Sequence, residues 1–256
     1  MNKLKNKIVF ITGATSGIGK SCAEAFAREK SDLILTGRRV ERLKNLAAKL
    51  EKNYAIKTKS VKLDVRDFNQ VKKAVGSLDS KWNKIDILLN NAGLARGFNK
   101  IYDGKKIDWD EMIDTNVKGL AYVTRIILPL MIKRKKGHVI NIGSTAGHEV
   151  YPNGNVYTAT KFAVKALSQS IRVDVLDKGI KVSSVDPGMV ETEFSLVRFR
   201  GDKNRAGNVY KGLKPLSPED VAEAVLFCAG RPDNVNINEV ILTPLAQASS
   251  TQVHRK

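Results

Sequence analysis

Tyr157, Lys161 and Ser144 have the residue types and the spacing of an acid–base site. Tyr157 and Lys161 are four residues apart, which on a helix stacks both side chains on one face and brings an ammonium group near a phenol. A phenol has a pKa of about 10 in a model peptide, and a nearby cation lowers that pKa. Ser144 follows a predicted strand, where its hydroxyl can hold a substrate oxygen. We expect Tyr157 to act as acid or base, although a Ser and a Tyr-x3-Lys pair also occur on ordinary surfaces.

A glycine-rich turn near the amino end has the composition of a phosphate-binding turn. It reads TGATSGIG over residues 12–19 and an amphipathic segment follows at once. Glycines let the backbone approach a pyrophosphate, and the next helix presents unpaired N–H groups to it. An ordinary strand-to-helix turn can look the same, but this one lies in the first strand–helix connection, where dinucleotide folds bind their ligand. The candidate contacts are Gly13, Thr15, Ser16, Gly17, Ile18 and Gly19.

Arg38 and Arg39 follow the second predicted strand, where an NAD-selective protein places an acidic residue against the ribose 2′-hydroxyl. Two guanidinium groups instead match the 2′-phosphate of NADP. The alternative is a solvated pair at the start of the second helix, but cations there oppose the helix dipole. We therefore predict NADP as the cofactor.

Alternating strands and helices must position these groups. Short β-branched runs alternate with amphipathic stretches, a pattern typical of a parallel sheet built from strand–helix–strand units. We predict an α/β Rossmann-type fold, with one doubly wound seven-stranded parallel sheet flanked by helices. The predicted strands are residues 8–12, 33–36, 58–63, 85–90, 137–142, 181–185 and 239–242, and the predicted helices lie near residues 17–29, 39–52, 67–81, 108–132, 155–178 and 218–229.

Composition narrows the class of protein. The 256 residues are 42% hydrophobic and contain no repeat or Ser/Gly/Pro linker, so we expect a single domain over residues 1–256. The apolar run at residues 126–132 is far shorter than the roughly 20 residues of a membrane-spanning helix. Residues 8–11 are too short for the core of a signal peptide, so we expect a cytoplasmic protein without a membrane partner. Cys22 and Cys228 lack metal-ligand spacing, and we expect reduced thiols and no metal.

The chain is strongly basic, since 44 Lys and Arg against 26 Asp and Glu give a net charge of +18. The basic residues are scattered, and the one dense run, residues 133–136, directly follows an apolar helical segment, where cations complement the helix dipole. No aromatic interleaving accompanies that run, which argues against nucleic acid as a partner. We expect a small anionic substrate instead.

Two segments break the alternation. Residues 189–216 follow the sixth predicted strand without a clear period, and we expect a substrate loop at the carboxyl edge of the sheet. Its Arg198 and Arg200 are candidate partners for a substrate carboxylate, with solvated lid arginines as the alternative. Residues 244–256 form a polar tail that we expect to be ordered against a neighbouring subunit.

Taken together, these motifs resemble the short-chain dehydrogenase/reductase family from about Lys5 to Leu242. TGATSGIG resembles the family's glycine turn, and residues 90–93 resemble its NNAG segment. The resemblance implies a catalytic tetrad of Asn116, Ser144, Tyr157 and Lys161, in which Asn116 holds a relay water and Lys161 also binds the nicotinamide ribose. Further cofactor contacts implied by the resemblance are Asp64, Val65, Asn91, Ala92, Gly93, Tyr157, Lys161, Pro187, Gly188, Val190 and Thr192.

A narrower resemblance is to NADP-dependent 3-hydroxy acid dehydrogenases of the serine and allo-threonine dehydrogenase type. It is carried by NIGSTAG at 141–147, GNVYTATK at 154–161, TEFSLVRFRGD at 192–202, VNIN at 235–238 and the terminal VHRK. It implies hydride transfer between NADP and the 3-hydroxyl carbon of serine, allo-threonine, 3-hydroxyisobutyrate or 3-hydroxypropionate, or the matching semialdehyde or ketone, in a homotetramer. Asp186 stands where the resemblance predicts Glu.

Two other functions stay open. The same scaffold and tetrad serve broad carbonyl reductases and 3-oxoacyl-thioester reductases, because they determine the hydride chemistry and not the substrate. A non-catalytic NADP-binding regulator or a basic nucleic-acid-binding protein would have no need of Ser144, Tyr157 and Lys161 together.

Overall fold

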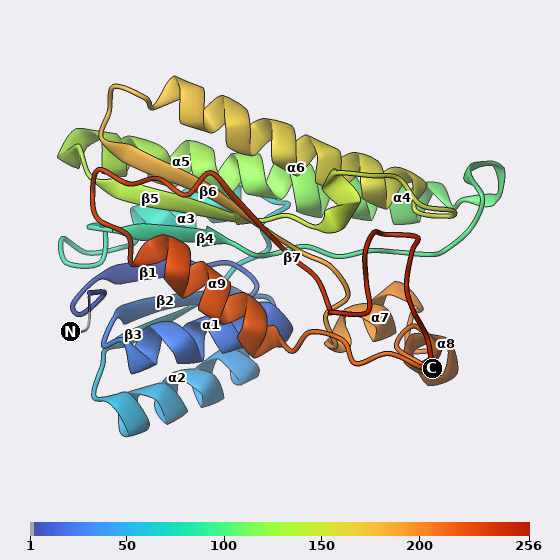
Figure 1. Cartoon of the computed structure of the whole chain (residues 1–256). Coiled ribbons are helices and arrows are strands. Elements are labelled where there is room, and N and C mark those ends of the chain that lie inside the picture. The colour runs from blue at the N-terminus through green and yellow to red at the C-terminus, as the bar shows by residue number, and fades with distance from the viewer. Residues whose placement is uncertain (1–2) are drawn as a thin grey trace.

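Seven parallel strands form one sheet in the order β3-β2-β1-β4-β5-β6-β7 in the computed structural model, which describes residues 3–256 (Figure 1). The strands are β1 (Ile8–Ile11), β2 (Asp32–Gly37), β3 (Thr58–Lys62), β4 (Ile87–Asn90), β5 (Gly137–Ile142), β6 (Ile180–Pro187) and β7 (Glu239–Leu242). The strand order reverses between β1 and β4, so the loops after these strands part and leave room for a ligand at the carboxyl edge. The predicted seven-stranded Rossmann-type sheet is confirmed.

The central strands are apolar because both of their faces are covered. All four residues of β1 are buried, and Val9 pairs with Leu33 on one side and Ile87 on the other. The edge strands β3 and β7 keep partly exposed residues instead. A buried parallel sheet of this kind holds its carboxyl edge rigidly, which suits a site built there.

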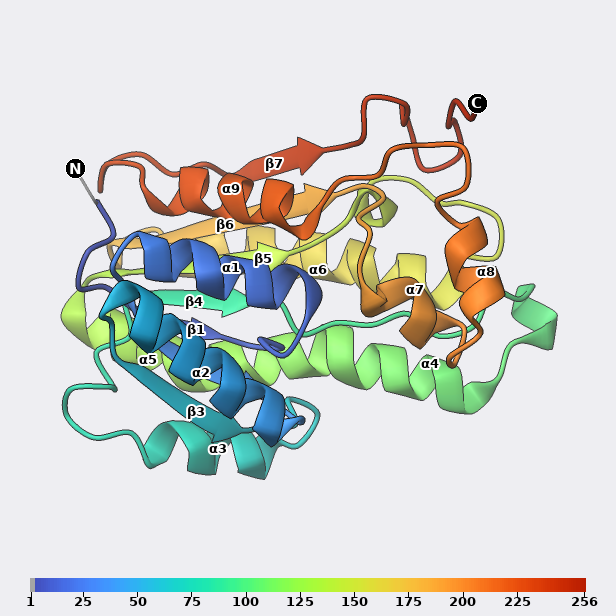
Figure 2. The same cartoon turned by 90° about the horizontal axis from the view of Figure 1, so that it is seen from below.

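Two layers of helices cover the sheet (Figure 2). Side chains of α1 (Gly17–Arg28), α2 (Val40–Tyr54) and α9 (Pro218–Ala229) pack into one core, and those of α3 (Phe68–Gly76), α5 (Leu120–Arg134) and α6 (Asn155–Asp174) into the other. Cys22 and Cys228 are free, buried thiols of the first core, as expected. Short turns η1 (Ile101–Asp103) and η3 (Thr145–Gly147) complete the carboxyl edge.

The helix expected over residues 108–132 differs from the structure. It is α4 (Lys106–Ile113) and α5, joined by a π-helical segment, η2 (Asp114–Gly119). The Asn116 side chain lies in this segment and is bonded to the backbone of Leu94, a long-range contact that periodicity cannot show. Two other helices end earlier than expected, α3 at Gly76 and α6 at Asp174.

Residues 189–216 contain two short helices, α7 (Glu193–Arg198) and α8 (Lys203–Asn208). The tail folds back against this segment of its own chain. The Gln247 side chain accepts a hydrogen bond from the Met189 N–H at 2.8 Å, and the Lys256 N–H donates to the Gly212 carbonyl at 2.9 Å. The tail thus has partners within its own chain, and its expected packing against a neighbouring subunit stays a prediction.

The dense basic run ends α5. Arg134 donates to the Ile85 carbonyl at 2.8 Å, and Lys135 adopts a left-handed conformation with φ of 51°. These residues terminate a helix, as predicted from their position. No helix within residues 3–256 is long and apolar enough to cross a membrane.

Candidate active site and dinucleotide cleft

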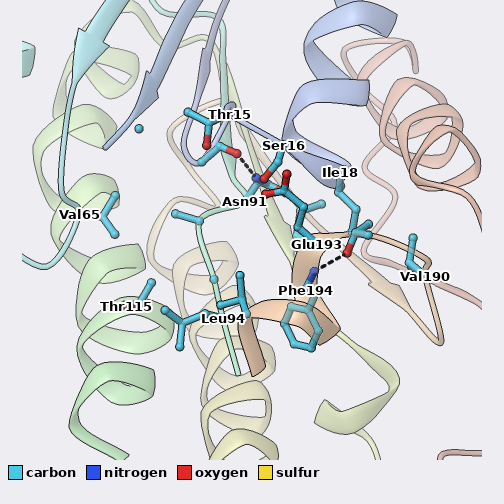
Figure 3. A pocket seen from close by; sticks show the side chains of 18 of the residues that line it. Thr15, Ser16, Ile18, Val65, Asn91, Leu94, Thr115, Val190, Glu193 and Phe194 are labelled. Atoms are coloured by element: carbon cyan, nitrogen blue, oxygen red, sulfur yellow. Dashed lines mark hydrogen bonds between the residues drawn. The ribbon is translucent and has the colours of Figure 1, made fainter. Parts of the chain in front are cut away.

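A cavity of about 350 Å³ lies along the carboxyl edge, and its lining includes Arg38, Arg39, Tyr157 and Lys161. Figure 3 shows Thr15 and Ser16 of the glycine turn near Glu193 of α7 in this cavity. We call it the glycine-turn cavity. Every predicted cofactor contact except Gly19 lines it, namely Gly13, Thr15, Ser16, Gly17, Ile18, Arg38, Arg39, Asp64, Val65, Asn91, Ala92, Gly93, Tyr157, Lys161, Pro187, Gly188, Val190 and Thr192. Segments that are up to 179 positions apart thus meet in one groove, as the resemblance implied.

Close packing explains the glycines of the turn. Gly13 has φ of +66° and Gly17 has φ of +51°, a region that favours glycine. A Cβ on Gly19 would lie 2.4 Å from the Gly13 carbonyl oxygen, so Gly19 supports the turn from behind and does not line the cavity. A Cβ on Gly17 would lie 3.2 Å from Thr192 across the groove. Because Gly13 and Gly17 carry no side chain, the backbone of the turn can approach a bound phosphate.

Thr12 ties the turn to the end of β4. Its hydroxyl accepts hydrogen bonds of 2.9 Å from the Asn91 and Ala92 N–H groups, and the Asn91 amide donates back to the Thr12 carbonyl at 2.8 Å. The role of Thr12 could not be predicted from the local sequence, because its partner lies 79 positions away.

The first turn of α1 faces the cavity with free N–H groups. Ser16 is the N-cap residue, but its side chain does not cap the helix and instead accepts a hydrogen bond from Arg39 at 2.7 Å. A helix N-terminus of this kind, with the positive end of the helix dipole, binds anions. The cradle fits a dinucleotide pyrophosphate.

Arg38 and Arg39 play different parts in the structure. Arg39 donates to Thr15 at 2.8 Å and forms an ion pair of 2.8 Å with Glu193, which also pairs with Arg42. These two arginines hold the pKa of Glu193 below its usual value. No carboxylate in residues 3–256 lies within 4.0 Å of the Arg38 guanidinium. Glu193, absent from the expectations, links α7 to the glycine turn.

Tyr157 and Lys161 are buried on α6, one turn apart, beside Ser144. The Lys161 ammonium donates to the Ile142 carbonyl at 3.0 Å and lies 5.9 Å from the centre of the Tyr157 ring. Burial raises the pKa of Tyr157, although the Ser144 hydroxyl opposes the rise. Burial also lowers the pKa of Lys161 to about 8, an effect that Asp186 counteracts. The lowering of the Tyr157 pKa expected from Lys161 therefore does not decide the direction of the shift, because burial dominates.

Asn116 lies behind the cavity wall rather than on it. Its amide donates to the Leu94 carbonyl at 2.8 Å and to the Thr160 hydroxyl at 3.0 Å, while its oxygen accepts from the Leu94 N–H at 2.9 Å. Both amide protons are thus used inside the protein. The expected relay water cannot be held by them, and Asn116 instead braces the segment after NNAG against α6.

A second cavity, of about 490 Å³, opens beside the first, and we call it the arginine cavity. Arg198, Arg205 and Arg255 line it, and no Asp or Glu does. Arg198 stacks on Phe98 at 4.7 Å and lies 5.7 Å from the Tyr157 ring centre. The two cavities share Ser144, Tyr157, Gly188, Val190 and Phe194. Tyr157 and Ser144 therefore stand in the wall between a dinucleotide cleft and a cationic cavity.

Arg200 does not reach either cavity. It pairs with the buried carboxylate of Asp108 and lies outside both linings. The expectation that Arg200 contacts substrate is therefore wrong. Arg198 is the last residue of α7, and Arg200 lies two residues beyond it. Their side chains point in different directions, and of the two only Arg198 faces Tyr157.

A doubly wound parallel sheet with a glycine turn at its switch point defines the class of Rossmann-fold dinucleotide-binding proteins. The short chain dehydrogenase family model matches residues 7–201. The chain belongs to this family of oxidoreductases, which confirms the resemblance of its motifs.

Individual relatives are similar over their full length. The chain is 44% identical over 257 residues to the NADP-dependent 3-hydroxy acid dehydrogenase of Schizosaccharomyces pombe, covering 100% of this chain and 99% of that protein. It is 42% identical over 249 residues to the serine 3-dehydrogenase of Rhizobium radiobacter, covering 97% and 98%. A closed form of serine dehydrogenase complexed with NADP⁺ superposes with a TM-score of 0.91 at 43% identity, covering 97% of this chain and 100% of that one.

Proposed function

We propose that this protein is an NADP-dependent oxidoreductase that transfers a hydride between NADP and the 3-hydroxyl carbon of a short 3-hydroxy acid. The main support for this proposal is that Ser144 and Tyr157 lie in the wall shared by the glycine-turn cavity and the arginine cavity. A group bound in one cavity can react with a group bound in the other only at this wall. The relatives named as 3-hydroxy acid and serine dehydrogenases support the same chemistry.

NADP fits the glycine-turn cavity by its charges. The free N–H groups of α1 suit the pyrophosphate, and Arg38, with Arg39 beside it, suits the 2′-phosphate. When bound, NADP accepts or supplies the hydride. Lys161, which lines this cavity, is positioned to hold the nicotinamide ribose, as the family resemblance implied.

Tyr157 moves the proton. In the reducing direction its phenol, whose pKa is raised by burial, donates a proton to the substrate carbonyl oxygen while the hydride arrives at the carbon. In the oxidising direction the substrate hydroxyl gives this proton back to the phenolate as the hydride leaves. Ser144 holds the same oxygen, and Lys161 supplies the positive charge that stabilises the phenolate.

Arg198 is the residue we propose for the substrate carboxylate. It belongs to the arginine cavity, has no carboxylate partner within 4.0 Å among residues 3–256, and lies near Tyr157. A planar guanidinium can bind a carboxylate through two hydrogen bonds. Serine, allo-threonine, 3-hydroxyisobutyrate, 3-hydroxypropionate and the matching semialdehydes carry this group.

A broad carbonyl or 3-oxoacyl-thioester reductase is the second candidate. The arginine cavity has about 490 Å³ and includes Phe98, Met189 and Phe199, more space and apolar surface than a three-carbon acid fills. A longer carbonyl substrate would use that surface.

A substrate panel separates the two candidates. Purified protein is incubated with NADP and serine, 3-hydroxyisobutyrate or 3-hydroxypropionate, and separately with NADPH and uncharged aldehydes or a 3-oxoacyl thioester, while the absorbance of the reduced cofactor is recorded. We expect the hydroxy acids to give the higher kcat/KM. Arg198→Ala should then raise KM for the acids at least roughly tenfold, the size of one lost charge-assisted hydrogen bond, and spare an uncharged substrate. Equal losses for both substrate types would make Arg198 a residue that folds the α7 segment.

We further propose a homotetramer located in the cytoplasm. Exposed apolar side chains gather in two places, on α6 and just after it at Phe162, Val173 and Leu176, and at α9, β7 and the next loop at Phe227, Ile241 and Leu245. Two separate apolar faces can form two different two-fold interfaces, which together generate a tetramer. Light scattering of the purified protein tests the subunit number, and cell fractionation tests the location.

A further inference from the structure

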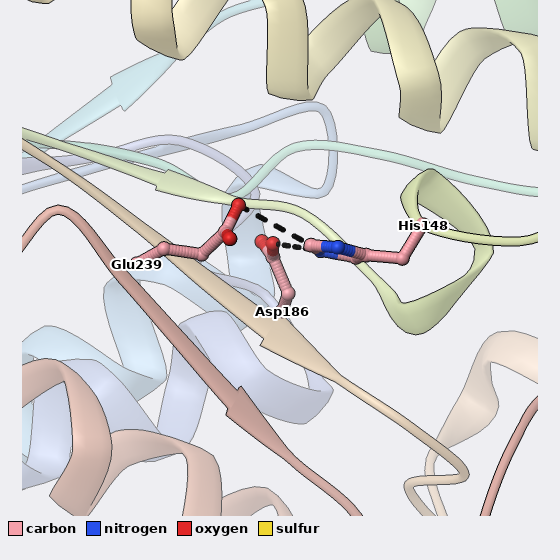
Figure 4. Close-up of side chains that lie close together, drawn as sticks. All are labelled: His148, Asp186 and Glu239. Carbon is pink, nitrogen blue, oxygen red and sulfur yellow. Dashed lines mark hydrogen bonds and ion pairs between the residues drawn. The ribbon is translucent and has the colours of Figure 1, made fainter.

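Behind the cavity wall, three titratable side chains meet that the proposed reaction does not use (Figure 4). His148 follows η3, Asp186 is the second-last residue of β6, and Glu239 begins β7. The His148 Nε2 lies 2.6 Å from Asp186 Oδ2 and 3.7 Å from Glu239 Oε1. Asp186 is 1% exposed, and burial raises its pKa. Burying a carboxylate costs free energy unless it is paired and hydrogen-bonded, so the position of Asp186 calls for an explanation.

Hydrogen bonding determines which nitrogen of His148 carries the proton. The Lys165 ammonium lies 2.9 Å from His148 Nδ1, and an ammonium can only donate. Nδ1 therefore accepts, and Nε2 carries a hydrogen that it donates to Asp186. Because Nε2 then has no free lone pair, the cluster is not arranged as a metal site despite its His, Asp and Glu ligands. It is a hydrogen-bonded chain from α6 to the end of β6.

The Asp186–His148 bond closes a short loop that contains Ser144. On one side of Ser144, the Gly143 N–H donates to the Val185 carbonyl of β6 at 2.9 Å. On the other side, His148 is bonded to Asp186 of the same strand. Residues 143–148 are therefore fastened to β6 at both ends. The Ser144 hydroxyl, which accepts from the Ala146 N–H at 3.1 Å, is held in between.

Asp186 also lies against the backbone beside Lys161. A Cβ on Gly143 would lie only 2.0 Å from Asp186 Oδ1, so the carboxylate contacts the residue between Ser144 and Ile142. The Ile142 carbonyl receives the Lys161 ammonium. The negative charge of Asp186 opposes the lowering of the Lys161 pKa by burial. One carboxylate thus supports the placement of Ser144 and the charge of Lys161.

We infer that Asp186 and His148 are positioning residues of the proposed reaction: their bond fastens residues 143–148 to β6, and the Asp186 carboxylate is the buried counter-charge of Lys161. The inference rests on the proposed function. The charged or titratable groups that face this pair are Lys165 and Glu239, and those that face Lys161 are Tyr157 and Asp186; the neutral Ser184 hydroxyl also donates to Asp186.

The test compares pH profiles for NADPH-dependent carbonyl reduction by the full-length protein. Asp186→Asn keeps the shape and removes the charge, so kcat should fall roughly 10- to 100-fold through misplacement. The alkaline limb of kcat/KM should move to lower pH by about one unit, because Lys161 loses its counter-charge. A purely structural role would leave that limb in place. Asp186→Glu keeps the negative charge and introduces the residue type expected from the family resemblance. It should leave kcat and the alkaline limb of kcat/KM close to their wild-type values.

His148→Gln separates the two parts of the inference. It keeps the Asp186 charge but changes the fastening of residues 143–148, so kcat should fall while the alkaline limb stays. Glu239→Gln is the matched control, because Glu239 is 3.7 Å from His148 and should leave both quantities unchanged. NADPH affinity measured by fluorescence should be unchanged in every variant.

Several outcomes would overturn the inference. An active wild type with unchanged kcat and pH profile in both Asp186→Asn and His148→Gln contradicts it. If Asp186→Asn does not fold, an unchanged kcat in His148→Gln is decisive against the fastening. A wild type inactive with every substrate and NADPH instead refutes the proposed function.

Discussion

Tyr157 owes its position to the start of α6, which places it and Lys161 one turn apart at the carboxyl edge of the sheet. Phe194 of α7 contacts the Tyr157 ring edge to face, with centroids 5.7 Å apart. The phenol is therefore buried between α6 and α7, and this burial raises its pKa. Its reactivity depends on neighbours that are distant in the sequence.

Tyr157→Phe removes the one phenol among residues 3–256 that lines both cavities, so kcat should fall at least roughly 100-fold, as expected for loss of a general acid–base group. The ring and its packing are kept, and NADPH binding should be unchanged by fluorescence titration. Tyr151→Phe, a phenol of the arginine cavity alone, is the control. Near wild-type turnover in a folded, NADPH-binding Tyr157→Phe protein would remove Tyr157 from the mechanism.

Arg38 and Arg39 should determine cofactor choice. A charge-assisted hydrogen bond contributes about 1.5–3 kcal/mol, so losing both arginines should reduce the NADP-over-NAD ratio of kcat/KM by tens to thousands-fold. Steady-state kinetics with both cofactors measures that ratio. Arg42→Ala is a matched control, because Arg42 pairs with Glu193 but does not line the cavity. Equal use of NAD and NADP by the wild type would contradict the prediction.

At the scale of elements, the strands were predictable and several helical details were not. A strand buried on both faces reads as a continuous apolar run, and IVFI in β1 is such a run. The π-helical segment at Asp114–Gly119 was not predicted, because the helical period of the sequence does not show it. Its Asn116 bonds to Leu94, 22 positions away, a contact that only the fold creates. Local signals for the short helices did exist, since Thr192 and Asp202 cap α7 and α8.

The residues of the candidate site likewise include some that the sequence predicts and some that it does not. The motif residues came from local patterns, and the glycine-turn cavity gathers nearly all of them. Thr12, Glu193 and the His148–Asp186 pair escaped, because each acts through a partner that only the fold brings near. Asn116 was assigned to the site from its motif position and Arg200 from its proximity in the chain. In the structure the Asn116 amide bonds to Leu94 and the Arg200 guanidinium pairs with Asp108 instead.

The tail is the element whose removal should be most informative. Gln247 is buried and accepts from the Met189 N–H, and Arg255 lines the arginine cavity. Deleting residues 247–256 should raise the substrate KM at least roughly tenfold, equivalent to one lost charge-assisted hydrogen bond, and leave the NADP affinity unchanged. Gln247→Ala should produce part of the same effect without shortening the chain. Unchanged kinetics in the deleted protein would show that the tail is dispensable for the substrate site.

The stability of the whole molecule should depend on His138, a buried residue near the start of β5. Its Nε2 lies 2.8 Å from the Ser183 hydroxyl, and burial lowers its pKa to about 3, with a smaller contribution from Lys181. In the unfolded chain a histidine has a pKa of about 6.5. Between these values the unfolded state binds more protons than the folded state, so the free energy of unfolding decreases as the pH falls.

Urea unfolding at pH 7 and pH 5 tests this dependence. From the linkage relation, His138 should account for a loss of about 2 kcal/mol at pH 5, and none well above pH 6.5. His138→Gln, which does not titrate, should lack this part of the pH dependence even if it is less stable at pH 7. Equal losses in the wild type and the variant would show that His138 is not the group responsible.

The folded-back tail also has a practical consequence for handling the protein. Lys256 is bonded to Gly212, and Arg255 donates to the Lys211 and Val209 carbonyls, so any polypeptide fused after Lys256 begins at the rim of the arginine cavity. Residues 3–7 lie at the opposite, amino edge of the sheet, ahead of β1 (Figure 1). An affinity tag for purification or immobilisation therefore belongs at the amino end, where it leaves the mouth of the cavity open.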